Sequence, residues 1–410
     1  APAGCLDERA EADPPRPAAW IDLARALSAA RAQQELGRYD EARAAADAVA
    51  TDAADEGALA LRAEALTIAG EIERLRGHLD EAGRLLTEAV STADRAGADL
   101  ARASALIQLA RVAGEDRAQG VEAGQYIALA RGVVARLDAP PALAIEIDQT
   151  EAILDVDQRR AGHALPLLTH ALELCREAGL SPMLEISLRH DLAGVYSELG
   201  RSEDAFAEYQ RLAEIVEARL GPDHVSVAAV HINMGAALYQ LRRLDEAEAH
   251  AVRGVTTMRR ALGDSPRLAA ALDHLCIIQA AAGRLEQAIA TSGEALALNE
   301  RLLGASHPDL AGSFTNLATM QRELGRRDDA RRSYQRAIEI CDAAPVPTGI
   351  PVAIPLTLLA ELELEAGNAR AAVDAARRAV TLGAGDAVPA WDLTRPKRIL
   401  TQALARLGRR

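Results

Sequence analysis

The stretch Leu199-Gly-Arg-Ser-Glu-Asp-Ala205 decides the fold, because it returns along the chain at a nearly constant interval. Its leucine and glycine are typical of a helix end, and its alanine of the start of a second helix after a charged turn. Related phrases occur at residues 35–42, 241–247, 283–288, 324–330 and 367–372. A phrase that recurs at a fixed period predicts a repeat architecture.

The alanine that ends the phrase sets the register of the whole chain. Small residues also recur seven positions after this marker alanine and twelve positions before it, which predicts close contact between two antiparallel helices. The markers are 40 to 42 residues apart and there are nine of them: Ala42, Ala82, Ala123, Ala164, Ala205, Ala247, Ala288, Ala330 and Ala372.

Each repeat is therefore expected to contain a helix A, a short turn and a helix B. In the fifth repeat we expect helix A at about residues 184–199, a glycine cap at Gly200, and helix B at about residues 203–220. Gly263-Asp-Ser-Pro266 is one of several connectors in which glycine stops helix B and a polar residue with proline opens the next helix A.

Composition excludes several classes of protein. Hydrophobic residues make up 49% of the 410-residue chain and aromatic residues only 2%, which favours closely packed helices over disorder. The net charge of −14 argues against binding to nucleic acid, which requires basic surfaces. No apolar stretch is long enough for direct insertion into a membrane.

The marker residues have the spacing of the tetratricopeptide repeat. Residues 220–235 and 303–318 resemble kinesin light chain repeats, with a period of about 42 residues. This resemblance implies an all-α, right-handed superhelical solenoid of about nine helix pairs with a C-terminal capping helix. We expect a leader or linker at residues 1–19, looser repeats at 20–182, kinesin-light-chain-like repeats at 183–342, and a terminal repeat with the capping helix at 343–410, all in one continuous solenoid.

The arrangement also resembles the C-terminal region of myxobacterial-type serine/threonine protein kinases. The phrase Cys5-Leu-Asp-Glu-Arg9 is similar to one that lies just before the repeats in those proteins. The chain has no glycine-rich phosphate loop, His-Arg-Asp loop or Asp-Phe-Gly motif. Any kinase activity would therefore belong to sequence outside this chain.

No residue pattern indicates catalysis, a metal site or a cofactor. His163 and His170 lie seven residues apart on one expected helix, without the intervening carboxylate of a His-Glu-x-x-His motif. Cys276 falls on a small-residue packing position, which predicts a buried, unreactive thiol. An enzyme with its site in the irregular termini remains a minor alternative.

A peptide-binding groove is the favoured site. In tetratricopeptide superhelices the A helices line the concave face, and by resemblance to kinesin light chains Asn233 and Asn316 occupy the asparagine of that family's Asn-Leu-Gly phrase. His274 occupies the same repeat position between them, and Asp191 one repeat earlier. An amide can exchange hydrogen bonds with a peptide backbone, although these asparagines could instead bridge neighbouring helices. The further candidates for ligand contact are His190, His231, Tyr239, Thr315, Thr319 and Arg322.

We therefore predict a non-catalytic protein–protein interaction module that binds a protein or peptide in its concave groove. It would serve as the regulatory or sensory arm of a bacterial signalling protein such as a serine/threonine kinase; the alternative is a free-standing adaptor or scaffold. The acidic balance favours a basic or neutral partner. The expected location is the cytoplasm, or the soluble part of a membrane-tethered protein, and self-association is left open.

Overall fold

The computed structural model describes residues 17–35, 38–114, 119–137, 140–343, 352–383 and 393–408. These residues form nineteen α-helices and no strand, which confirms the predicted all-α fold. Most of the predicted leader, residues 1–16 with the phrase at Cys5, lies outside the described residues, as do residues 384–392 and 409–410 of the terminal segment.

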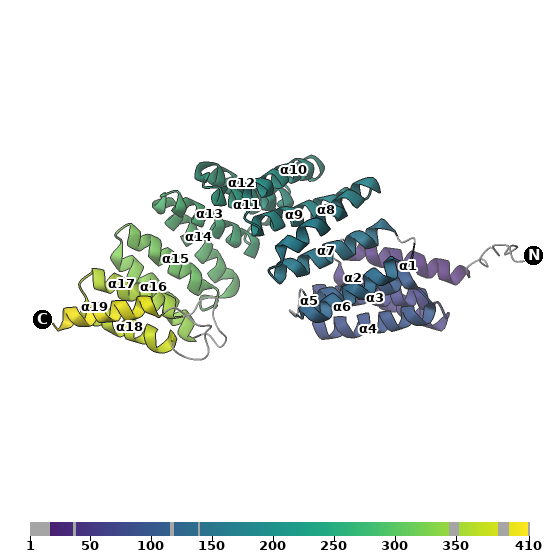
Figure 1. Cartoon of the computed structure of the whole chain (residues 1–410), viewed down its shortest axis with the longest axis horizontal. Helices are drawn as coiled ribbons and strands as arrows, with labels where there is room; N and C mark the ends of the chain where they lie inside the picture. The colour runs from purple at the N-terminus through teal and green to yellow at the C-terminus, as the bar shows by residue number, and fades with distance from the viewer. Residues whose placement is uncertain are drawn as a thin grey trace, which may run out of the picture. The chain divides into compact units, whose positions relative to one another are not determined.

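The first compact unit, Ala1–Gly200, contains nine of these helices. Each A helix is followed in sequence by the B helix of its repeat (Figure 1). The A helices are α1 (Ala18–Glu35), α3 (Leu59–Leu75), α5 (Asp99–Gly114), α7 (Pro141–Asp157) and α9 (Pro182–Glu198). The B helices are α2 (Tyr39–Asp55), α4 (Leu79–Ala96), α6 (Gly120–Val134) and α8 (Ala161–Glu177).

The second compact unit, Arg201–Arg410, begins in the turn between α9 and the B helix of the same repeat. Continuity of one solenoid through this turn stays a prediction. The B helices are α10 (Ser202–Leu220), α12 (Leu244–Leu262), α14 (Leu285–Leu303), α16 (Arg327–Ala343) and α18 (Ala369–Gly383). The A helices are α11 (Val225–Gln240), α13 (Pro266–Ala281), α15 (Leu310–Glu323), α17 (Ala353–Glu365) and the final helix α19 (Thr394–Leu407).

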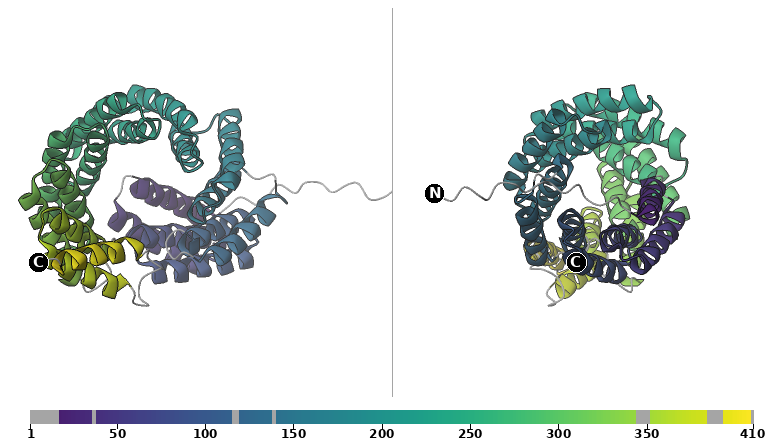
Figure 2. Two further views of the ribbon diagram at one scale, coloured as in Figure 1. Left: turned by 60° about the vertical axis from the view of Figure 1, so that its left-hand side comes forward. Right: turned by 90° about the vertical axis from the view of Figure 1, so that its right-hand side faces the viewer.

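The helices of each unit form two layers, which Figure 2 shows for the second unit as two rows of teal-to-green helices. Within each unit, several A helices of successive repeats contact one another, as α11 does α13 and α15 does α17. Within each unit the B helices pack closely against the A helix of the same repeat, as α12 does against α11, and against the A helix of the next repeat, as α12 does against α13. The A helices therefore form one layer of each unit and the B helices the other.

The local sequence explains where the helices end. Gly200 has a φ of +70°, a left-handed conformation that glycine adopts without strain, and its N–H bonds the carbonyl of Ser197. At the other kind of connector, the Ser265 hydroxyl accepts the backbone N–H of Leu268 at 3.3 Å, ahead of the proline that opens α13. The observed bounds of α9 and α10 agree with the prediction to within two residues.

The marker alanines lie at the tightest contacts. All nine are fully buried, with 0% of their surface exposed. Where the chain has glycine in the same packing layer there is no room for a methyl group: a Cβ on Gly254 of α12 would lie 2.7 Å from Cδ1 of Ile232 and 2.9 Å from the carbonyl oxygen of Ala228. A Cβ on Gly235 of α11 would lie 3.0 Å from the carbonyl oxygen of Ala247. The small residues are therefore required by the approach of helix A to helix B.

Arginine–carboxylate pairs bridge successive repeats on the exposed side of the second unit. Arg253 of α12 donates to Glu217 of α10 at 3.0 Å. Arg326, in the turn between α15 and α16, donates to Glu286 of α14 at 2.6 Å. Exposed pairs of this kind contribute little each. They do show that arginines in this unit are widely engaged by carboxylates within the chain.

Candidate functional site

A groove of the second unit lies between the A helices α13 and α15 and has a volume of about 690 Å³. We call it the second-unit groove. Helices α11 and α14 contribute one residue each at its edge. Its lining consists of Tyr239, Asp273, Cys276, Ile277, Ala280, Ala281, Ser292, Asp309, Gly312, Ser313, Asn316, Thr319, Met320 and Glu323.

The lining combines apolar and acidic groups. Ile277 is 47% exposed and gives the groove an open apolar surface. Asp273 lies one helical turn before it, Asp309 immediately precedes α15, and Glu323 is the last residue of that helix. No arginine, lysine or histidine is among the residues that line the groove. The groove therefore offers negative charge beside an apolar surface.

Asp273 and Cys276 form the deeper part of the lining on α13. Burial raises the pKa of the Asp273 carboxyl from 3.8 to about 6. Burial, together with the charge of Asp273, raises the pKa of the Cys276 thiol to about 11. The thiol lies 3.8 Å from the sulfur of Met320 and stays protonated at neutral pH, as expected for a packing cysteine.

Three residues predicted to contact a ligand line the second-unit groove: Tyr239, Asn316 and Thr319. The Asn316 side chain is exposed, so its amide is open to a ligand. Thr319 is half-buried, and its hydroxyl lies 3.0 Å from both the carbonyl oxygen of Thr315 and the hydroxyl of Tyr334. Asn316 is thus the predicted residue best placed to bind.

Two other candidates are buried between helices. Thr315 is 5% exposed and its hydroxyl donates to the carbonyl of Ala311 at 2.8 Å. His231 is 3% exposed and stacks on His250 of α12, with 2.9 Å between their Nδ1 atoms. Burial leaves neither side chain open to a ligand in this structure.

The remaining predicted residues lie apart from the second-unit groove. Asn233 is half-buried and His274 is exposed, and neither belongs to its lining. Arg322 ties α15 to α17, since its guanidinium donates to Glu361 at 3.1 Å and also to Glu365. Although burial opposes it, pairing with these carboxylates raises the pKa of Arg322. Its role is to join repeats.

The first unit has a smaller pocket, which contains the one remaining predicted residue, His190. His190 and Asp191 line a pocket of about 230 Å³ with residues of α7, α8 and α9. The Asp191 carboxylate accepts a hydrogen bond from Gln149 of α7 at 2.6 Å. Asp191, which replaces the expected asparagine in this repeat, therefore bridges two A helices.

A second groove of the first unit was not anticipated. It has a volume of about 480 Å³ and runs across the A helices α1, α3, α5 and α7. Gln108 donates to the Glu146 carboxylate at 3.0 Å, and burial raises the pKa of Glu146. Three of its lining residues, Glu64, Glu71 and Glu146, are glutamates on A helices. The recurring phrase contains none of these positions, so the sequence did not set them apart from other glutamates on the helices.

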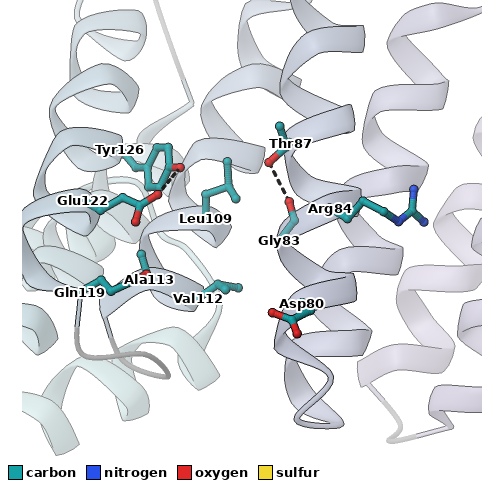
Figure 3. A pocket seen from close by; sticks show the side chains of 10 residues that line it. All are labelled: Asp80, Gly83, Arg84, Thr87, Leu109, Val112, Ala113, Gln119, Glu122 and Tyr126. Carbon is teal, nitrogen blue, oxygen red and sulfur yellow. Dashed lines mark hydrogen bonds between the residues drawn. The ribbon is translucent and has the colours of Figure 1, made fainter.

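A further pocket of about 380 Å³ lies where the outer helices α4 and α6 separate over α5 (Figure 3). Its polar groups are engaged within the chain. Tyr126 donates to Glu122 at 2.9 Å, and Thr87 donates to the carbonyl of Gly83 at 2.7 Å. Arg84 points away from the tyrosine and donates to Glu81 at 2.7 Å. This pocket follows from the divergence of the B helices.

Neither a metal centre nor a membrane span is found in the parts of the chain that the structure describes. No three histidine, cysteine, aspartate or glutamate side chains of those parts gather where they could hold a metal ion. His170 instead pairs with Asp148, at 2.6 Å between Nδ1 and Oδ2. Within the same residues no helix combines the length and the apolar character that crossing a membrane requires.

The tetratricopeptide repeat family model matches residues 184–260, 267–343 and 314–383. Among curated proteins, the regulatory protein AfsR of Streptomyces griseus is 32% identical over 195 residues, which cover 47% of this chain and 18% of AfsR. The Arabidopsis thaliana protein KINESIN LIGHT CHAIN-RELATED 1 is 28% identical over 233 residues, covering 46% of this chain and 38% of that protein. The chain thus spans well under half the length of both relatives.

Solved structures show the same fold at low sequence identity. The apo form of RapI has a TM-score of 0.64 and 11% identity, and the match covers 88% of this chain and 97% of RapI. A signal-transduction ATPase of Pyrococcus horikoshii with a tetratricopeptide repeat sensor has a TM-score of 0.61 and 17% identity, over 78% of this chain and 47% of that one. A Rap protein complexed with Competence and Sporulation Factor has a TM-score of 0.53 and 13% identity, over 93% and 99%.

The family model matches the same residues in which glycines cap the helices and the marker alanines are buried. The chain therefore carries tetratricopeptide repeats over residues 184–260 and 267–383, and these repeats are similar to those of kinesin light chains.

Proposed function

We propose that this chain is a non-catalytic protein–protein interaction module and that the second-unit groove receives an extended peptide segment of its partner. The observation that carries the proposal is the placement of the exposed Asn316 amide in a groove of about 690 Å³ between two A helices. An amide offers one acceptor and two donors, which suits the repeating N–H and C=O groups of an extended backbone. A groove lined by packed helices holds such contacts in place.

The proposed setting is the regulatory or sensory arm of a larger bacterial signalling protein. Two similarities support it: the curated relative from Streptomyces griseus is a regulatory protein, and the ATPase from Pyrococcus horikoshii uses tetratricopeptide repeats as its sensor. The resemblance to the C-terminal region of myxobacterial-type kinases points to the same setting. A serine/threonine kinase is therefore one class of protein to which such an arm could belong.

The free-standing adaptor is distinguished from this arm by the gene itself. A reading frame that encodes a catalytic or ATPase domain on the same polypeptide supports the arm. A reading frame that holds only repeats supports the adaptor. Both alternatives use the same groove, so the binding experiment below does not depend on the outcome.

Replacing Asn316 by alanine is expected to weaken peptide binding about 3- to 10-fold, the effect of losing one or two hydrogen bonds to a peptide backbone. Peptides are first selected from a displayed library of random dodecapeptides on the full chain, and their affinities are measured by fluorescence anisotropy. Asn299→Ala makes the same change on the B helix α14, outside the groove lining, and is expected to leave affinity unchanged.

Circular dichroism of both variants controls for folding. Selected peptides that bind Asn316→Ala and the parent chain equally well would place the ligand elsewhere on the molecule. A library that yields no binders to the full chain would argue against the function as a whole.

A further inference from the structure

Asp273 departs from the residues at its own repeat position. Counted from the small residue on helix A, the equivalent positions in the neighbouring repeats are Ile232 and Thr315, which are 7% and 5% exposed. Both neighbours are uncharged and contribute to packing. A carboxylate at this position loses part of its hydration, which is why its pKa is raised to about 6. The chain thus holds a charge where its own repeats hold none.

In contrast to Asp273, the carboxylate of Glu361 on a later A helix is paired with arginine side chains. Glu361 of α17 accepts hydrogen bonds from Arg322 at 3.1 Å and from Arg395 at 2.7 Å, and these pairs lower its pKa against the effect of burial. Among the residues that the structure describes, none is hydrogen-bonded or ion-paired to Asp273. Asp273 is half-buried. A carboxylate that is partly withdrawn from water without a counter-charge destabilises a fold, and such residues are concentrated at functional sites.

No group of the groove can supply that counter-charge. The titratable groups that line the groove with Asp273 are Cys276 on its own helix, Tyr239 on α11, Asp309 at the N-cap of α15, and Glu323 at the end of α15. Every one of them is neutral or negative at pH 7. A cation that pairs with Asp273 has to come from the bound molecule.

Ile277 indicates which cation fits. It lies four residues after Asp273 and so on the same face of α13, and it is exposed where the neighbouring repeats have the smaller Ala236 and Thr319. An arginine side chain has a methylene stem that packs on apolar surface and a planar head that forms two parallel hydrogen bonds to a carboxylate. Lysine has the stem but only a point charge at its head.

We propose that the second-unit groove selects an arginine of its peptide ligand, with the guanidinium paired to the Asp273 carboxylate and the methylene stem packed on Ile277. This inference rests on the proposed function of the groove and names the chemistry of the partner: an extended protein segment with an arginine, in surroundings that are not acidic. Asp309 and Glu323 add attraction at the rim of the groove.

The test uses the library-selected peptides on the full chain. The selected sequences are expected to be enriched in arginine, and a peptide in which citrulline, a neutral isostere, replaces that arginine is expected to bind at least about tenfold more weakly. Asp273→Asn is expected to lose as much affinity for the arginine peptide and to bind the arginine and citrulline peptides alike. Glu214→Gln removes an exposed carboxylate from α10 and is expected to change neither affinity.

Two further measurements separate recognition from folding. The thermal midpoint of Asp273→Asn is expected to rise at pH 7, because the variant removes an unpaired carboxylate that the fold holds in its charged form. Affinity of the parent chain for the arginine peptide is expected to fall between pH 7 and pH 5, because protonation makes Asp273 neutral, and Asp273→Asn is expected to lack this dependence.

The outcomes distinguish the two proposals. Peptides that bind in an Asn316-dependent way but tolerate citrulline or Asp273→Asn would overturn the arginine preference and leave the peptide-binding function standing. Enrichment of acidic peptides would also overturn it. Failure to obtain any peptide that binds would overturn both.

Discussion

Gly254→Leu is expected to lower the free energy of unfolding by about 3 kcal/mol or more, the upper part of the range for overpacking a tight helix contact. Even a methyl group at this position meets Ile232 at 2.7 Å and the backbone oxygen of Ala228 at 2.9 Å. A side chain can rotate away, but a backbone oxygen moves only with its helix. Helix α12 would have to separate from α11, and the contact between the two is among the most extensive in the chain.

Gly293 provides the matched control. It lies in the next B helix, α14, where an added Cβ meets no atom within 4 Å. Because alanine is the better helix former, Gly293→Ala is expected to raise stability by about 0.5–1 kcal/mol, whereas Gly254→Ala is expected to lower it. Urea unfolding followed by circular dichroism measures both. Equal effects at the two glycines would show that the register does not control packing.

This pair of predictions shows how much of the fold the sequence contains. The recurrence of Leu-Gly-Arg before a marker alanine predicted both helices of each repeat, and the buried markers confirm it. Close contact between two adjacent helices requires small residues at the same positions in every repeat, so these residues recur periodically in the sequence. Packing that involves only neighbouring repeats can be predicted in this way.

The groove was predicted less completely, for a geometric reason. A groove between α13 and α15 takes side chains from facing sides of the two helices, so it includes Asn316 of α15 but not His274, which has the same repeat position on α13. Residues at the same repeat position lie on the same face of every A helix. A groove between two A helices is instead lined by one face of the first helix and a different face of the second. Asp273 was missed because it lies on the second face; comparison with Ile232 and Thr315 would have revealed it.

A histidine close to the asparagine position was also not enough to predict a residue open to a ligand. His231 was expected in the groove because it lies close to the asparagine position, yet its ring is buried and stacks on His250, between α11 and α12. A polar side chain at a core-facing position can be retained when a second polar group meets it. His250 supplies that group, and no pattern within one helix could indicate it.

Acidification from pH 7 to pH 5 is expected to cost the fold about 2 kcal/mol through this histidine pair. Burial, with the nearby charges of Arg253 and His250, lowers the pKa of His231 from 6.5 to about 4. The unfolded chain therefore binds a proton as the pH falls below 6.5, and the folded chain does not until about pH 4. Stability attributable to His231 is complete above pH 6.5 and is lost between pH 6.5 and pH 4.

The geometry of the pair gives the reason. The Nδ1 atoms of His231 and His250 are 2.9 Å apart, so one ring donates and the other accepts, and the accepting ring has to be neutral. Burial also lowers the pKa of His250, so the charged form is disfavoured on both rings. His231→Leu is expected to reduce the loss of stability between pH 7 and pH 5 by about 2 kcal/mol, because the leucine does not titrate.

His274→Leu is the matched control, since it makes the same substitution at an exposed histidine on the adjacent A helix and is expected to keep the pH dependence of the parent chain. Urea midpoints at pH 7 and pH 5 measure the difference, and nuclear magnetic resonance titration of the ring protons reports the pKa directly. Titration of His231 near 6.5 in the folded chain, or equal pH dependence of the two variants, would contradict the buried neutral pair. Helix α13, which carries Asp273, packs against both α11 and α12, so acid is expected to loosen the contact between α11 and α12 over the pH range in which Asp273 loses its charge.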